Sequence, residues 1–121
     1  MKNWIVFGLF LAALAVTLGA FGAHGLKSKV SPADLAIFET SVRYHMYHAL
    51  GLILIGILGF HYNFQIIQLP AVLLSIGILL FSGSLYILVF AGLRWMGAIT
   101  PIGGIALIAG WILLAIRLIK S

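Results

Sequence analysis

The chain alternates between long apolar stretches and short polar connections. Four stretches are nearly free of polar side chains and cover roughly residues 3–23, 44–60, 69–91 and 98–116. Three of them reach the ~20 residues that a helix needs to cross ~30 Å of hydrocarbon. The second is shorter, but the helix that carries it is expected to begin earlier in the chain. This pattern predicts an all-α integral membrane protein with four transmembrane helices.

The connections are too short to hold a second domain, so we expect a single four-helix transmembrane domain over residues 1–121. The predicted helices cover about residues 3–23, 32–60, 69–91 and 100–118. No alternating strand pattern of the kind found in membrane barrels occurs. At a rise of 1.5 Å per residue the second helix would be ~44 Å long. That exceeds the hydrocarbon thickness, so its N-terminal portion is expected to lie in the membrane interface.

Boundary signals surround the start of this second helix. Ser31 can cap it, Pro32 suits its first turn, and Asp34 places a carboxylate near free backbone amides. The small residues of 19–25 are expected to end the first helix. The first apolar stretch is longer than the about 7–15 residues of a cleavable signal, so we expect it to be a retained span.

Composition narrows the possible partners. Hydrophobic residues make up 64% of the chain, charged residues only 7%, and cysteine is absent. Disulfides, thiolate metal sites and cysteine nucleophiles are therefore excluded. The seven basic residues are spread over loops and ends, so we expect membrane lipids as partners and no nucleic acid. Their numbers on the two membrane sides nearly tie, which leaves the orientation open, including a dual topology.

Ionisable side chains gather at the head of the second predicted helix. Glu39 and Arg43 are four residues apart and can meet on one helix face. Tyr44, His45 and His48 fall on roughly the opposite face. Two interpretations stay open. Either an ion pair accompanies an interfacial aromatic belt, or one face lines a polar cavity or headgroup site in which a histidine titrates near neutral pH.

Later segments carry weaker signals. Ser82, in Phe81-Ser-Gly-Ser-Leu-Tyr86, is expected to bond its own backbone or to permit close helix packing. Thr100 is expected to cap the fourth helix, whose free amides could also hold an anion. Two stripes of small residues favour tight helix contacts within or between subunits. They are Ala12, Ala15, Gly19 and Ala23 in the first helix, and Gly103, Ala106 and Gly110 in the fourth.

Neither metal binding nor catalysis is indicated. His45 and His48 are three residues apart, but no zinc-binding motif surrounds them and His61 should lie at the far membrane face. No base is placed beside a serine hydroxyl. We therefore expect no cofactor, no metal and no enzymatic activity.

Four ordered motifs resemble the DUF423 (UPF0382) family of small four-span membrane proteins. They are Gly19-Ala-Phe-Gly-Ala-His-Gly-Leu26, Phe38-Glu-Thr with Arg43-Tyr and Met46-Tyr-His-Ala-Leu50, Phe81-Ser-Gly-Ser-Leu-Tyr86, and Gly97-Ala-Ile-Thr-Pro-Ile-Gly-Gly104. Glutamine is common in that family before Met46-Tyr-His, where this chain has His45. The resemblance implies a four-span fold in a bacterial plasma (inner) membrane and brings no activity with it.

Topology brings these motifs to one membrane face. The end of the first predicted span, the start of the second, the end of the third and the start of the fourth all share that side. We therefore expect a lipid- or small-solute-binding or transport unit that acts as a homo-oligomer; the alternative is a structural or assembly protein with no ligand. The candidate ligand-binding residues are His24, Glu39, Arg43, Tyr47, His48, Ser82, Tyr86 and Thr100.

Overall fold

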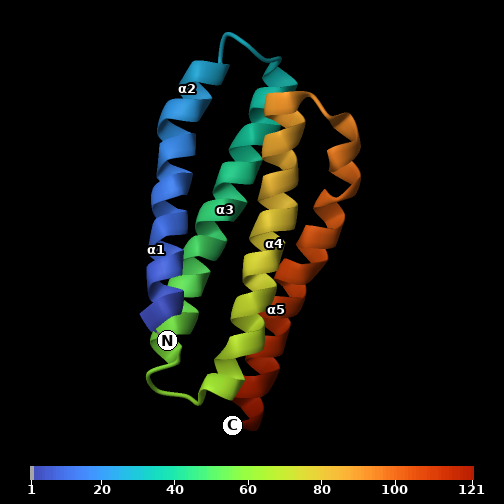
Figure 1. The fold of residues 1–121 in the computed structure, drawn as a ribbon. Coiled ribbons are helices and arrows are strands. Elements are labelled where there is room, and N and C mark those ends of the chain that lie inside the picture. Colours follow the sequence, from blue (N-terminus) through green and yellow to red (C-terminus); the bar gives the residue numbers. More distant parts are fainter. Residues whose placement is uncertain (1) are drawn as a thin grey trace.

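The computed structural model describes residues 2–121, which form long helices joined by short connections (Figure 1). Residues 2–26 form one continuous helix, here called the first helical rod, whose pitch changes along its length. Short turns separate the other helices. In chain order the elements are α1 (Lys2–Thr17), the π-helical turn η1 (Leu18–Gly22), α2 (Ala23–Leu26), α3 (Pro32–Leu58), α4 (Phe64–Ala91), the 3-10 turn η2 (Arg94–Ala98) and α5 (Thr100–Lys120).

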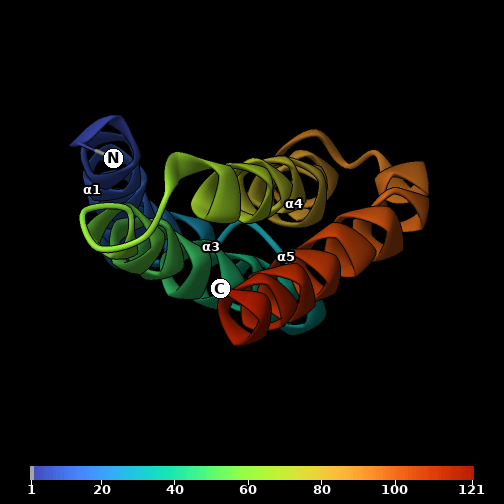
Figure 2. The ribbon, with the colours of Figure 1, turned by 90° about the horizontal axis from the view of Figure 1, so that it is seen from below.

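The long helices form a zigzag row. Viewed along the helices, α1 and α5 lie at opposite ends of this row, with α3 and α4 between them (Figure 2). Each long helix packs mainly on its neighbour in the chain, α1 on α3, α3 on α4 and α4 on α5. The structure therefore does not confirm the four-helix bundle expected from the sequence.

Three helical segments, rather than the predicted four, are long and apolar enough to cross a membrane by length and composition. The long helix outside this set is α3, although it has 27 residues. It carries Arg43, His45 and His48, whose side chains lower the mean hydropathy of the helix. The polar portion predicted at its N-terminus thus lowers the mean hydropathy of α3 more than expected. The three segments are Lys2–Leu26, Phe64–Ala91 and Arg94–Lys120.

The first helix runs further than predicted. The small residues at 19–25 do not end it; the chain passes through the π-helical turn and continues to Leu26. Side chains of α3 lie directly against this turn, with Val42 next to Gly19 and Phe38 next to Gly22. The neighbouring helix therefore fills the space that the missing side chains leave, and the helical path is kept.

The third long helix begins earlier than predicted, at Phe64 instead of residue 69, so that Pro70 lies inside it. The helices at the two ends of the row, α1 and α5, both form hydrogen bonds to the first turns of α4. Trp4 of α1 donates from Nε1 to Oε1 of Gln68 at 3.0 Å, and Arg117 of α5 donates to the backbone carbonyl of Gln65 at 2.7 Å. These distant contacts support a helical turn where local sequence suggested a loop.

Close helix contacts explain the two stripes of small residues. Gly103 of α5 lies on the backbone of α4, where an added Cβ would come within 2.3 Å of the Phe81 nitrogen. Gly110 packs on Leu74 of α4 in the same way, and Ala15 is fully buried on α1. Both stripes therefore serve packing within this chain.

Candidate functional site

Two serines join α3 and α4 in the interior. Ser41 donates from Oγ to the backbone carbonyl of Ser82 at 2.9 Å, and Ser82 donates from Oγ to the carbonyl of Ser41 at 2.8 Å. Both residues are fully or almost fully buried. Each hydroxyl is thus satisfied by the opposite helix, and the backbones are held close together. The sequence predicted close packing at Ser82, but not its partner.

His45 and Tyr86 form a second contact between α3 and α4. Nδ1 of His45 lies 2.8 Å from the Tyr86 hydroxyl. The other ring nitrogen, Nε2, is buried and has no hydrogen-bond partner among residues 2–121. The backbone of Leu11 in α1 lies near this ring. One polar atom is therefore left unsatisfied where three helices meet.

Thr100 joins α5 to α4 rather than capping α5. Its hydroxyl hydrogen-bonds with the hydroxyl of Ser84, and α5 begins at Thr100 itself without a side-chain cap. The predicted cap is therefore wrong. A Thr-Pro pair suggests a helix start, but it does not show that the threonine will face a serine of the neighbouring helix.

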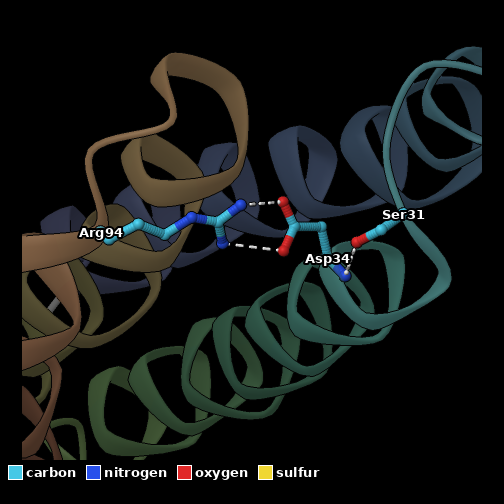
Figure 3. Close-up of polar contacts among 3 residues, drawn as sticks. All are labelled: Ser31, Asp34 and Arg94. Carbon is cyan, nitrogen blue, oxygen red and sulfur yellow. Dashed lines mark hydrogen bonds and ion pairs between the residues drawn. The ribbon is translucent and has the colours of Figure 1, made fainter.

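An ion pair ties the start of α3 to the turn that follows α4 (Figure 3). Both terminal nitrogens of Arg94 donate to the carboxylate of Asp34, at 2.8 and 2.7 Å. Ser31 accepts a hydrogen bond from the Asp34 backbone nitrogen at 3.1 Å, which confirms the predicted cap. Asp34 therefore both follows the cap and receives a bidentate pair from a residue 60 positions away.

The Arg94 bonds have an electrostatic consequence for Asp34. They hold the pKa of the Asp34 carboxyl below its ordinary value of 3.8, so the carboxylate stays ionised at neutral pH. Sequence reasoning missed this pair because it read Asp34 only as part of a helix start and Arg94 only as one of several loop charges.

Glu39 and Arg43 do not pair with each other. Both are exposed, and Arg43 donates to the hydroxyl of Thr40 at 3.2 Å instead. Within residues 2–121 the Asp34–Arg94 contact is the ion pair that forms. Of the two interpretations left open by the sequence, the one with a Glu39–Arg43 ion pair is therefore wrong.

These two charges flank a shallow groove between the first helical rod and α3. The groove has a volume of about 310 Å³. Small and apolar side chains line it next to the two charges, which leaves an acidic and a basic group beside an apolar floor. Its lining is Gly19, Ala23, Phe38, Glu39, Val42 and Arg43.

Tyr44 and His48 lie on another face of α3. Their rings stack at a centroid distance of 6.3 Å, and the ring of His48 is 5.8 Å from that of Trp111 in α5. Nδ1 of His48 is bonded to the Tyr44 carbonyl at 2.7 Å. Together with Phe81 and Gly104, these residues line a groove of about 470 Å³ between α3 and α5.

The other candidate residues lie apart from these groups. His24 is exposed on α2. Tyr47 is exposed on α3, with its ring 5.7 Å from that of Tyr44. Among the residues that the structure describes, no group of three or more histidine, cysteine or acidic side chains could hold a metal ion.

The structure thus does not bring the candidate residues into one cavity. Ser82, Tyr86 and Thr100 lie in helix contacts, where Ser41, His45 and Ser84 are their partners. The remaining residues lie on separate surfaces. Glu39 and Arg43 line one groove, His48 lines another, and His24 and Tyr47 are exposed.

Helical architecture, apolar spans and interior polar contacts define an all-helical membrane protein. A family model described as "Protein of unknown function (DUF423)" matches residues 18–104. The chain belongs to this family, which confirms the resemblance noted from its motifs.

Relatives match along almost the whole chain. A UPF0382 membrane protein of Staphylococcus haemolyticus is 45% identical and covers 99% of this chain and 98% of its own length. The UPF0382 membrane protein YwdK of Bacillus subtilis is 46% identical with the same coverage. A third, from Staphylococcus saprophyticus, is 47% identical over 99% of both chains. No solved structure matches this chain.

Proposed function

We propose that the protein is a multi-pass protein of a bacterial plasma membrane in which α3 is the fourth span. At 1.5 Å per residue, its 27 residues extend about 40 Å, enough to cross the hydrocarbon with an interfacial portion. α3 lies between α1 and α4 in the row (Figure 2). The partners of Ser41 and His45 on α4 reduce the cost of placing those polar groups in the membrane.

We propose further that the protein binds a membrane phospholipid at the groove beside Glu39 and Arg43. The observation that carries this proposal is an exposed guanidinium that pairs with no carboxylate among residues 2–121, next to an apolar groove. A guanidinium binds phosphate oxygens well, in a geometry with two parallel hydrogen bonds. The acyl chain of the lipid would lie along the small side chains of Gly19 and Ala23.

Glu39 adds a second recognition element. Its carboxylate is exposed one helical turn from Arg43 and forms no ion pair with it. A zwitterionic headgroup carries a phosphate and an amine, which fit an arginine and a glutamate held side by side. The proposed ligand is therefore a phospholipid with an amine in its headgroup.

Native mass spectrometry of the protein released from nanodiscs tests this function. Wild type should retain phosphatidylethanolamine, and Arg43→Ala should weaken retention about tenfold, because a charge-assisted hydrogen bond is lost. Lys120→Ala is the matched control, since it removes an exposed basic side chain from the other end of the molecule. Equal lipid retention by wild type and Arg43→Ala would refute the proposal.

A second candidate function is structural. The contacts Ser41–Ser82, Ser84–Thr100 and Asp34–Arg94 each use polar side chains to hold two elements together. This favours a scaffold or assembly protein with no ligand and no catalytic step. Its signature in the same experiment is the absence of any lipid retained specifically by wild type.

A transport role would need several copies of the chain. A zigzag row of four helices has two open sides and encloses no path by itself (Figure 2). A transport role therefore requires a homo-oligomer. Chemical crosslinking in native membranes tests this: a ladder of oligomers supports transport, and a monomer alone removes it.

A further inference from the structure

The groove between α3 and α5 has the features of a separate binding site. Aromatic rings form its walls: the Tyr44 ring lies 4.9 Å from that of Phe81, and the Trp111 ring lies beside His48. Gly104 lines it without a side chain, which leaves room of about 470 Å³. This groove does not share residues with the one beside Glu39 and Arg43.

His48 supplies a hydrogen-bond acceptor to this groove. The Tyr44 carbonyl can only accept, so Nδ1 of His48, 2.7 Å away, must carry the ring proton. Nε2 of the neutral ring is then an acceptor, and it has no hydrogen-bond partner within residues 2–121. His48 as a residue is only 6% exposed and lines this groove, and its Nε2 is not among the fully buried, unpartnered polar atoms of residues 2–121. A ligand with a hydroxyl donor matches it.

The depth of the groove argues for a neutral ligand. α5 has 21 residues and is about 31 Å long, close to the hydrocarbon thickness, so Thr100 lies near one boundary. Gly104 and Trp111 then lie about 6 and about 16 Å inward from Thr100, along the helix axis. A charged headgroup at this depth is costly. An uncharged alcohol group with one hydrogen bond is far less so.

We propose that this groove binds a neutral membrane lipid that carries a hydroxyl group. The hydroxyl donates to Nε2 of His48, and the hydrocarbon chain lies along Trp111 and Leu107. Diacylglycerols and isoprenoid alcohols both have this chemistry. The site is independent of the proposed phospholipid groove, because its acceptor, its depth and its walls are different.

Photo-crosslinking of the wild-type protein in phosphatidylcholine nanodiscs tests the proposal. The probe is a diacylglycerol with a diazirine near the glycerol, and adducts are located by peptide mass spectrometry. Adducts should fall on residues 104–111 and their neighbours across the groove. Unlabelled diacylglycerol should compete, whereas the same lipid with its hydroxyl acetylated should compete about five- to tenfold less well, because the hydrogen bond is lost. A polyprenol competitor separates the two sources of the ligand.

Two variants make the test specific. His48→Phe keeps an aromatic ring against Trp111 but removes the acceptor, so it should abolish the preference for the free hydroxyl. Gly104→Ala narrows the groove, and its Cβ would meet Phe81 at an ordinary 3.7 Å, so the fold should be kept. Gly83→Ala, whose Cβ would have only Leu79 within 4 Å, is the matched control. Equal competition by free and acetylated lipid would overturn the hydroxyl assignment, and adducts elsewhere would overturn the site.

Discussion

Ser41 and Ser82 exchange hydrogen bonds with each other's backbone across the contact between α3 and α4. Ser75 forms a different kind of bond, because its hydroxyl donates to the carbonyl of Ala71 in its own helix at 2.8 Å. In a membrane, a bond between helices resists their separation, whereas a bond within one helix persists when helices part. The same residue type therefore has two physical roles on one helix.

Ser82→Ala should lower the free energy of unfolding by about 0.5–1.5 kcal/mol, since one hydrogen bond between helices is lost. Ser75→Ala should change it by much less. Unfolding in mixed detergent micelles, followed by circular dichroism, measures both. Equal effects of the two substitutions would mean that the reciprocal pair adds nothing to helix association.

The ion pair of Asp34 and Arg94 predicts an acid dependence of stability. The pKa of Asp34 is lower in the folded protein than its ordinary value of 3.8, so the unfolded chain binds a proton more readily. The stabilisation is fully present above that ordinary value and is lost as pH falls through the lower, folded pKa. At pH values below about 4, the thermal unfolding midpoint of wild type should therefore decrease relative to that of Asp34→Asn.

Glu39→Gln provides the control for this prediction, because Glu39 is exposed and forms no ion pair. Its thermal midpoint should follow that of wild type over the same pH range. If Asp34→Asn and wild type lose stability in parallel on acidification, the ion pair contributes nothing measurable.

At the scale of helices, the contact between α4 and α5 depends on a backbone approach that only glycine permits. A Cβ at position 103 would lie 2.3 Å from the backbone nitrogen of Phe81, which cannot move aside as a side chain can. The neighbouring position 104 faces the same phenylalanine, but only the edge of its ring, at 3.7 Å. A Cβ therefore fits at position 104 but not at position 103.

Gly103→Ala should push α4 and α5 apart and destabilise the protein by about 1–3 kcal/mol, as overpacking does elsewhere. Gly104→Ala should be close to neutral. Thermal unfolding of the two variants compares them directly. Similar losses at both positions would show that glycine is needed there for another reason.

A helix boundary can be predicted from the sequence when nearby residues determine it, but not when contacts from a distant helix do. The start of α3 follows from Ser31 and Pro32, which act locally, and it was predicted correctly. The start of α4 was placed too late, because Trp4 and Arg117 hold its first turns from distant positions. Local chemistry is readable from one sequence, whereas support from another helix is not.

The candidate site divides in the same way. Which helix carries each candidate residue follows from the sequence, since each motif belongs to a predicted helix or to the turn beside it. The contacts of the site depend on how each helix is rotated about its axis. That rotation sends Ser82 toward α3, Ser84 toward α5 and Arg43 toward the groove beside Gly19, and no spacing within one helix specifies it.

At the scale of the whole molecule, the topology has a direct test because the chain has no cysteine. If α3 crosses the membrane, the connection at 27–31 and the connection at 59–63 lie on opposite sides (Figure 1). Single cysteines introduced by Ser28→Cys and Asn63→Cys should then react with an impermeant maleimide from opposite sides of the membrane. Ser121→Cys should react from the same side of the membrane as Asn63→Cys.

Labelling of Ser28→Cys and Asn63→Cys from the same side would show that α3 does not span. A mixed result, with each position half labelled from each side, would indicate two orientations of the chain. The near tie in basic residues between the two sides makes that outcome informative about dual topology.

The polar first half of α3 also has a consequence for biogenesis. Ser41 and His45 find their partners on α4, which leaves the ribosome later. α3 alone would therefore enter the lipid with these groups unsatisfied, whereas α3 and α4 entering together bring the donors and acceptors with them. If α3 crosses the membrane as proposed, insertion is thus expected to proceed by a helical hairpin, with α3 held at the translocon until α4 has emerged.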